Sequence, residues 1–400
     1  MSELPTASNV TLCMVTHRRS GNLANALHSA SRLAREMVII DAGGAGSQAV
    51  RHLASEYDAQ YVSVAADPDE AALLNIALGN VKTPWALFLN QQEVLHAEDL
   101  QSIIDFLSNT QAIVVEIPLA RISEPGNFYF EIRLLRTDRN LRWEHMIYPS
   151  LDASLEQVAE KDGLENSISL LPVAAIISLG EPEYEEWELR DAVVRVEREL
   201  DKNPSSPRYW YFLARTSRAL EEWDRAHAAV EEGLSIVSKN IDAPRNDPQS
   251  VNGLIGMFCT SLLAGDSYPK KTVESLWLIY NNMESDGRFS VPLGQLLLAV
   301  NRIEDAISAQ RKAVDSFFNN RRYYLSLEEG LYRPILFAWE MEASRNQEHL
   351  LRSVVDIQVA LSQQQKKIQP LLQHVHDHNP TLFESIQEIL HKSLNKLGGE

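Results

Sequence analysis

The first half of the chain is organised around the stretch from Met37 to Gly46, which reads Met-Val-Ile-Ile-Asp-Ala-Gly-Gly-Ala-Gly. An apolar run rich in β-branched residues ends here at Asp41, and glycines follow it. Such a run is typical of a strand buried on both faces, and the glycines favour a tight turn into the next element. The segment therefore predicts one strand of a parallel sheet, with Asp41 at its carboxyl end.

Short apolar runs alternate with amphipathic stretches on both sides of this segment. We expect strands at Val10–Val15, Met37–Ile40, Tyr61–Val64, Trp85–Leu89 and Ala112–Ile117, and helices at Asn22–Arg35, Gln48–Tyr57, Asp69–Gly79 and Glu98–Leu107. This alternation predicts a Rossmann-like, mostly parallel sheet covered by helices on both faces. Beyond Pro118, Phe128–Leu135 and Leu170–Leu179 resemble strands of a small antiparallel extension.

The second half of the chain is predicted to be helical. A helix at Trp187–Leu200 ends at Asn203-Pro204, and Pro207–Asn240 carries the tetratricopeptide spacing. The residues that carry this spacing are Trp210, Leu213, Ala214, Ser217, Ala226, Val230 and Gly233. A weaker copy consists of Leu293, Gly294, Leu297, Ala306 and Ala313. The predicted fold class is thus α/β followed by all-α, with an α/β domain over residues 1–182 and a repeat domain over 183–400.

Further helices are expected along the repeat domain, at Asn252–Ala264, Lys271–Asn282, Leu331–Ala343, His349–Leu361 and Thr381–Leu397. Stacked helix pairs present an extended surface to protein partners. Trp210, Tyr211 and Arg215 are the predicted partner-binding residues of that surface. An approximate heptad seam between Val354 and Val375 is compatible with a homodimer contact or with packing inside the array.

Charge and composition narrow the classes of function. The formal net charge is −18, so the chain has no basic stripe with which to bind nucleic acid or an anionic membrane. The polar N-terminal residues predict no signal peptide, and the longest apolar run, Leu170–Leu179, has about half the length that spans a bilayer. Only Cys13 and Cys259 occur. We expect both to be buried packing residues of a cytoplasmic protein.

Four segments of the first domain form an ordered set: Leu12–Val15, Val38–Gly44, Trp85–Leu95 and Arg133–Glu144. In this order they resemble the family 2 glycosyltransferases of GT-A fold, in the bacterial branch that continues into tetratricopeptide repeats. The third segment resembles its Trp…Leu-Asp-Ala-Asp-Glu-Val-Leu stretch, and the fourth its Arg-Leu-Phe-Arg…Arg-Phe-Glu stretch. The likeness runs from about residue 10 to about residue 240. It implies transfer of a sugar from a nucleotide-sugar donor.

The chain departs from this family at the putative site. The family's Asp-x-Asp triplet holds a divalent metal against the donor diphosphate, but the triplet position here is Asn90–Gln92, which reads Asn-Gln-Gln. Neutral amides lack the negative charges that hard cations require, so we predict no metal site and no cofactor. Other family positions are also changed, at Arg18-Arg19, Leu74-Asn75, Tyr148-Pro149 and Ser178-Leu179-Gly180.

The polar residues that remain at these strand ends define a candidate site. Asp41, Glu93 and the two arginines each have a functional and a structural interpretation. In the resembled family, Asp41 faces the nucleobase, but a strand-end aspartate can instead cap the helix after Gly46. Glu93 is a candidate catalytic base toward an acceptor hydroxyl, or an ordinary solvated loop residue. Arg18 and Arg19 can grip a diphosphate without metal, or simply be solvated. The predicted nucleotide-sugar site consists of Asp41, Arg18, Arg19, Asn75, Asn90 and Gln92.

A second, separate metal-site candidate lies near the C-terminus. His374 and His378 would share one face of a helix four residues apart, as a metal-binding pair does. No third ligand is evident in the sequence, so a polar helix end is the alternative.

Two hypotheses for function follow. In the first, the protein is a degenerate glycosyltransferase, a pseudoenzyme that acts as an assembly module and binds a protein partner through its repeats. In the second, it is an active, metal-independent glycosyltransferase that uses a nucleotide sugar and acts on a protein or peptide acceptor. Loss of charge at both outer positions of the Asn90–Gln92 triplet favours the first.

Overall fold

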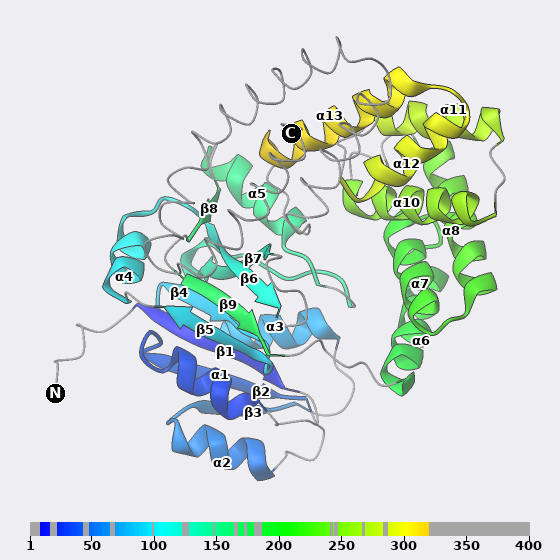
Figure 1. Ribbon diagram of the computed structural model, residues 1–400. Coiled ribbons are helices and arrows are strands. Elements are labelled where there is room, and N and C mark those ends of the chain that lie inside the picture. Colours follow the sequence, from blue (N-terminus) through cyan, green and yellow to red (C-terminus); the bar gives the residue numbers. More distant parts are fainter. Residues whose placement is uncertain are drawn as a thin grey trace, which may run out of the picture. The chain divides into compact units, whose positions relative to one another are not determined.

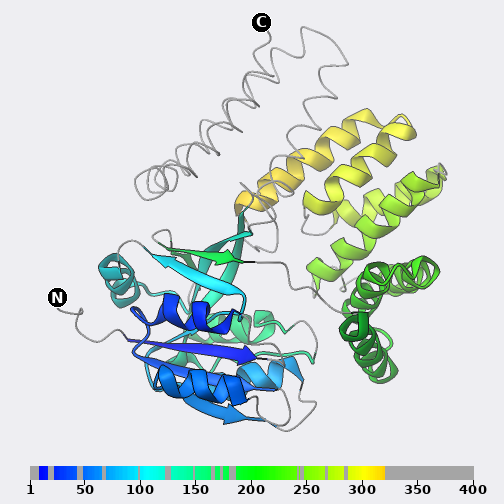
Figure 2. The ribbon, with the colours of Figure 1, turned by 60° about the horizontal axis from the view of Figure 1, so that its bottom comes forward.

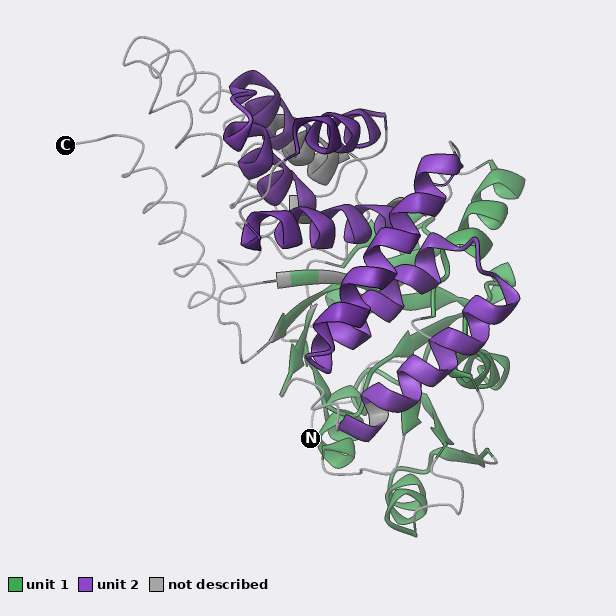
Figure 3. Ribbon diagram, turned by 90° about the vertical axis from the view of Figure 1, so that its right-hand side faces the viewer, with its two compact units in different colours: residues 1–183, 368–389 green, residues 184–367, 390–400 purple. Residues whose placement is uncertain are grey.

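The chain forms two compact units, and along the sequence one gives way to the other between Glu183 and Tyr184 (Figure 3). We call them the sheet unit, which holds the described strands, and the helical unit, which holds helices α6 to α13. The computed structural model describes residues 9–16, 22–42, 48–64, 69–97, 100–121, 128–146, 149–163, 167–171, 174–179, 186–240, 243, 247–265, 269–282 and 287–319.

The sheet unit is built on one mixed sheet of nine strands, ordered β3-β2-β1-β4-β7-β6-β9-β5, with β8 beside β6 (Figure 1). The strands are β1 Val10–Thr16, β2 Glu36–Asp41, β3 Gln60–Ser63, β4 Trp85–Phe88, β5 Glu93–Ala97, β6 Val114–Arg121, β7 Phe128–Arg136, β8 Ile168–Leu170 and β9 Ala174–Ser178. The helices are α1 Leu23–Ala30, α2 Gln48–Glu56, α3 Glu70–Gly79, α4 Leu100–Asn109 and α5 Asp152–Asp162.

The neighbouring strands β3, β2, β1 and β4 are parallel, so their carboxyl ends meet at one edge of the sheet. Thr16 of β1 lies opposite Asp41 of β2, and Asp41 lies opposite Ser63 of β3. β7 is the first antiparallel neighbour, paired with β4 and β6. We call the edge at which β1 to β4 end the carboxyl edge, since it is where ligands bind in open α/β sheets.

Helices cover both faces of the parallel strands (Figure 2). On one face, Leu12 and Met14 of β1 share a buried cluster with residues of α1, α2 and α4. On the other, Cys13 shares a cluster with residues of α3 and α5. Because successive side chains of a strand point to opposite faces, an apolar run with no polar alternation requires this double cover. The expectation of a mostly parallel, Rossmann-like sheet followed by helices is confirmed.

The structure adds elements that the sequence pattern did not predict. β5 pairs antiparallel with β9, Glu93 opposite Ser178, at the far end of the sheet from β3. The backbone N–H of Leu95 in β5 donates a 3.0 Å hydrogen bond to Ser29 Oγ of α1, so this end of the sheet curls back toward α1. α5 is a further unpredicted element. The expected strand at Leu170–Leu179 is two strands, β8 and β9, both parallel to β6.

The helical unit contains α6 Glu186–Lys202, α7 Pro207–Ala219, α8 Trp223–Lys239, α10 Pro248–Ala264, α11 Lys270–Asn281, α12 Gly287–Ala299 and α13 Ile303–Asn319. After α6, α7 pairs with α8 and α12 pairs with α13, while α10 packs against α7, α8 and α12. Buried side chains of α10, α11, α12 and α13, with Val237 of α8, form one cluster that includes Ile255, Trp277 and Leu297. The tetratricopeptide identity of these pairs stays a prediction.

The α7–α8 and α12–α13 pairs have the same turn, eighty positions apart. The N–H of Glu222 donates to the carbonyl of Ser217 at 2.9 Å, and the N–H of Arg302 donates to that of Leu297 at 2.7 Å. Glu221 and Asn301, the residues before these donors, have φ values of 60° and 59°. This is the left-handed cap that commonly ends a helix, usually with glycine in this position. The two turns are equivalent in geometry, and the repeat expected around Leu293 and Ala306 stays a prediction.

Both cysteines are buried, as expected: Cys13 and Cys259 have no exposed surface. Burial raises the pKa of both thiols well above their ordinary value. No helix within the described ranges has the length and apolar character needed to cross a bilayer. The predicted helices after residue 330, the heptad seam and the His374–His378 pair lie outside the described residues.

Candidate functional site

The predicted nucleotide-sugar residues that the structure describes lie on different elements, and Asn75 is in the middle of α3. Asp41 ends β2, and Asn90 and Gln92 lie in the turn between β4 and β5. Arg18 and Arg19 follow β1 and lie outside the described residues.

Asp41 is buried, with 1% of its surface exposed. Its Oδ2 accepts a 2.7 Å hydrogen bond from the hydroxyl of Tyr61 on the neighbouring strand β3. The guanidinium carbon of Arg51, from α2, lies 5.3 Å from the centre of the Tyr61 ring. Burial and the neighbouring Asp41 carboxylate raise the pKa of Tyr61, because both disfavour a phenolate. Asp41 therefore presents a carboxylate at the strand end that Tyr61 holds in one orientation.

Asn75 connects α3 to the segment that follows β7. Its Nδ2 donates to the carbonyl of Trp143 at 2.8 Å, and its Oδ1 accepts from the N–H of the same residue at 2.9 Å. The Trp143 ring meets the Phe88 ring edge to face at 5.7 Å, next to the end of β4. Both hydrogen-bonding groups of Asn75 are thus used to fix Trp143.

The turn from Asn90 to Glu93 is closed by the Glu93 side chain. Glu93 Oε2 accepts from the backbone N–H of Asn90 at 2.8 Å, and Oε1 accepts from its side-chain amide at 3.0 Å. The Glu93 N–H in turn donates to the Asn90 carbonyl at 3.0 Å. Across the turn, the Gln92 carbonyl accepts from the N–H of Leu179, after β9, at 2.9 Å. Glu93 is a buried residue that holds the turn.

Arg133 of β7 is the charged partner of Glu93. Its Nη2 lies 2.7 Å from Glu93 Oε1 and 2.5 Å from Glu131 Oε2, and the side chains of Arg133 and Glu93 are 8% and 6% exposed. Desolvation lowers the pKa of Arg133, but the carboxylates of Glu131 and Glu93 outweigh it and raise the pKa above its ordinary value. The guanidinium is therefore a fixed cation beneath the Asn90–Gln92 turn.

Several buried polar atoms at the carboxyl edge of the sheet have no hydrogen-bond partner among the described residues. They include Thr16 Oγ1 at the end of β1 and Gln91 Oε1 in the turn after β4. Trp143 Nε1 and Arg133 Nε are further examples. Buried polar groups are seldom left without partners in folded proteins, so these atoms are candidate contacts for a bound polar molecule. No group of three His, Cys, Asp or Glu side chains in the described ranges could hold a metal ion.

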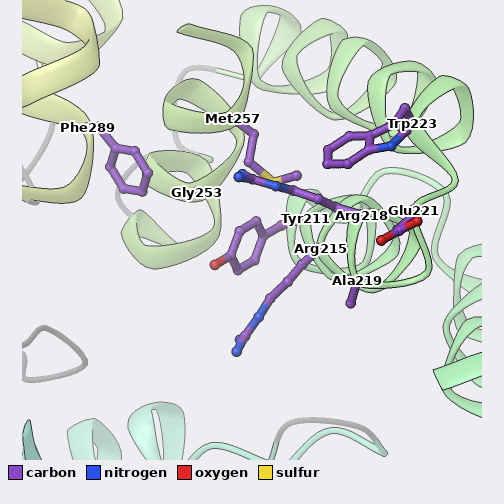
Figure 4. A pocket seen from close by; sticks show the side chains of 9 residues that line it. All are labelled: Tyr211, Arg215, Arg218, Ala219, Glu221, Trp223, Gly253, Met257 and Phe289. Carbon is purple, nitrogen blue, oxygen red and sulfur yellow. The ribbon is translucent and has the colours of Figure 1, made fainter. Parts of the chain in front are cut away.

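The helical unit contains a groove of about 500 Å³ between α7, the start of α8, α10 and α12. Two of the predicted partner-binding residues, Tyr211 and Arg215, line it (Figure 4). The third, Trp210, does not. Its Nε1–H donates to the Pro204 carbonyl at 2.8 Å, and its Cβ lies close to the backbone of Gly233 in α8. Trp210 therefore packs helix against helix.

Comparisons with known proteins give distant structural likenesses. No protein-family model matches the sequence, and no curated protein matches it. The structure of S. aureus TarS is 15% identical, with a TM-score of 0.36 over 77% of this chain and 54% of that one. Residues 1–349 of TarS in complex with UDP-GlcNAc give 14% identity and a TM-score of 0.38 over 79% and 93%. The chain thus spans about half the length of full TarS.

The sequence did not reveal every residue that is important at the carboxyl edge of the sheet and in the groove of the helical unit. The sequence gives Arg133 no role beyond its place in the stretch Arg133–Glu144, although Glu131 and Arg133 are two positions apart on one strand and so share a face. In the groove, sequence reasoning missed Arg218, which lies seven positions after Tyr211 and hence on the same face of α7. Trp223 and Met257 had no local signal, since the groove forms only when α8 and α10 pack beside α7.

Proposed function

We propose that the sheet unit is a glycosyltransferase-like domain without metal-dependent sugar transfer, and that the protein acts as a protein-binding module through its helical unit. The observation that carries the first part is the state of Glu93, the carboxylate nearest the Asn90–Gln92 turn. Both of its oxygens accept hydrogen bonds from Arg133 or Asn90.

The donor set at this turn does not fit a divalent metal. Mg²⁺ and Mn²⁺ bind anionic oxygens, whereas Asn90 and Gln92 offer only amides. Using Glu93 as a ligand would break its ion pair and leave the Arg133 cation buried with one fewer carboxylate, which is costly. No catalytic step is therefore assigned to a metal at this turn.

The alternative, an active metal-independent transferase, is favoured by other features of the same edge. Asp41 retains a buried carboxylate where the resembled family contacts the nucleobase. Thr16 Oγ1 and Gln91 Oε1 have polar capacity that a bound nucleotide would satisfy. In this hypothesis Arg18 and Arg19 hold the diphosphate.

A thermal-shift screen of the purified chain separates these hypotheses. UDP, GDP, dTDP, CMP and their sugars are each tested with and without Mn²⁺, since a ligand of the folded state raises the melting temperature. We expect no Mn²⁺-dependent shift in the native protein. Asn90→Asp combined with Gln92→Asp is the assay control, because two added carboxylates should create a Mn²⁺ response.

A melting-temperature shift that depends on Mn²⁺ and one that does not support different conclusions. A shift that Mn²⁺ increases in the native protein would refute a dismantled metal site. A shift with one nucleotide sugar that is indifferent to Mn²⁺, together with product formation, would establish the metal-independent transferase instead.

A further inference from the structure

The groove of the helical unit is lined by α7, the start of α8, α10 and α12. Tyr211, Arg215 and Arg218 come from α7, Met257 from α10 and Phe289 from α12 (Figure 4). Residues at positions 211, 215 and 218 lie on one face of a helix. The groove is therefore formed where α10 packs against α7, α8 and α12.

Glycines in α10 let two aromatic rings form the floor of this groove. A Cβ placed on Gly253 would lie 2.1 Å from the Tyr211 ring, and one placed on Gly256 would lie 1.7 Å from the Phe289 ring. Both distances are far below any permitted contact, so the rings rest directly on the α10 backbone. Tyr211 and Phe289 are buried accordingly, 7% and 5% exposed. The floor is apolar and held in place on both sides.

Exposed cations lie on the wall of the same groove. Arg215 and Arg218 are both exposed. Arg218 forms no ion pair or side-chain hydrogen bond with any other described residue. Other arginines of the unit are paired with carboxylates of the chain: Arg190 with Glu186, Arg195 with Asp191, Arg225 with Glu197 and Arg302 with Asp305. In a chain of formal charge −18, an exposed arginine in a groove remains available for an external carboxylate.

Large apolar side chains stand beside these cations. Trp223 is 61% exposed at the start of α8, and Met257 is half-buried. Tryptophan and arginine are the residues that most often dominate binding energy at protein interfaces, and methionine adapts its shape to a partner. Glu221 lies in the same groove and limits how much negative charge the groove accepts.

We propose that this groove binds an acidic peptide segment of a protein partner, with an Asp or Glu at Arg218 and Arg215 and an apolar side chain against Trp223 and Met257. A phosphate backbone fits less well, because Glu221 and the net negative charge of the chain repel a polyanion. The inference rests on the proposed function, since it names the chemistry of the partner of the helical unit.

A random-peptide phage library, selected against the full chain, tests the proposal. We expect the selected peptides to carry Asp or Glu next to Trp, Phe or Leu. Their binding, measured by fluorescence anisotropy with labelled peptide, should weaken at least about tenfold in Arg218→Glu. It should also weaken as salt is raised. Arg198→Glu is the matched control, because Arg198 is also an exposed arginine, on α6 and outside the groove.

A second variant keeps the test independent of charge. Trp223→Ala should weaken the same peptides, and melting curves of all three variants should match the native protein because the substituted side chains are exposed. Selected peptides without acidic residues, peptides that bind Arg218→Glu as tightly as the native chain, or failure to select any peptide would each overturn the proposal. An oligonucleotide that displaces the peptides with higher affinity would do so too.

The outcomes distinguish this proposal from the function on which it rests. Groove binding by purely apolar peptides would overturn the acidic partner and leave a protein-binding module. A Mn²⁺-dependent nucleotide-sugar response would overturn the degenerate sheet unit and leave acidic-peptide binding as it is.

Discussion

Arg133 in the sheet unit and Arg218 in the helical unit are both arginines, but the first is buried in ion pairs and the second is exposed in a groove. Arg133 lies inside the sheet unit between Glu93 and Glu131, and only 8% of its side chain is exposed. Arg218 lies on the wall of a groove in the helical unit, exposed and without a charged partner among the described residues. The Arg133 charge is neutralised by two carboxylates of the sheet unit. The Arg218 charge has no such partner among the described residues. An arginine therefore indicates recognition only when its surroundings leave it available.

Removing the buried charge should have the largest effect. We expect Arg133→Ala to lower the free energy of unfolding by about 3–5 kcal/mol, since Glu93 would stay buried with its cation lost. Urea denaturation measures this change. Arg195→Ala, which removes a helix-surface ion pair with Asp191, should cost at most about 0.5 kcal/mol.

A double substitution tests whether the loss of stability in Arg133→Ala comes from leaving the Glu93 charge buried without a partner. Arg133→Met combined with Glu93→Gln removes both charges and should recover part of the lost stability. If Arg133→Ala were no more harmful than Arg195→Ala, the contrast between a structural and an available arginine would be lost.

The groove depends on backbone contact more than on charge. We expect Gly253→Ala to destabilise the protein by about 1–3 kcal/mol, because the new methyl group would overlap the Tyr211 ring. Alanine in place of glycine usually stabilises a helix, so the sign itself is diagnostic. Thermal or urea unfolding gives the value.

Two variants control this prediction. Gly265→Ala, at the end of the same helix, meets only ordinary contacts at 3.5 Å and beyond and should be nearly neutral. Tyr211→Ala in the Gly253→Ala background should relieve the overlap, so that the double variant loses less than the two single losses added together. Additive losses would show that the ring does not rest on Gly253.

The smallest expected effect concerns the turn beside the groove. Glu221 has a φ of 60°, which a residue with a Cβ adopts at a cost. Glu221→Gly should therefore stabilise the protein by about 1 kcal/mol in urea denaturation. Asn301→Gly, in the equivalent turn, should gain less because asparagine tolerates this conformation. A larger gain at Asn301 than at Glu221 would contradict the strain assigned to Glu221.

The parallel strands were predictable because their signal is local. Val38–Ile40 and Trp85–Phe88 are apolar without alternation, and such runs occur where a strand is covered on both faces. β5 was not predictable in the same way. It is short, and its pairing of Glu93 with Ser178 joins distant parts of the sequence. The segment Leu170–Leu179 was expected to form one strand because nearly all of its residues are apolar. Pro172, which interrupts strands, was the signal for two.

The candidate site was only partly predictable from the sequence, because some of its contacts join residues that are far apart in the chain. A strand-end carboxylate such as Asp41 is visible in the sequence, because the strand and the turn after it are visible. The state of Glu93 is not, since it depends on Arg133, forty positions later, reaching it across the sheet. The groove depends on the packing of helices that are distant in the sequence. Tyr211 and Arg215 were identifiable on one helix face, but Met257 and Phe289 join them only through packing.

The burial of Cys13 and Cys259 has a practical consequence. A thiol reacts as its thiolate, and both residues are inaccessible with a raised pKa. The native chain is therefore a silent background for maleimide chemistry under folding conditions. Ala219→Cys, at an exposed position that lines the groove, would take up a dye at one defined point, and the dye's emission would report occupancy while Arg218 and Trp223 stay in place.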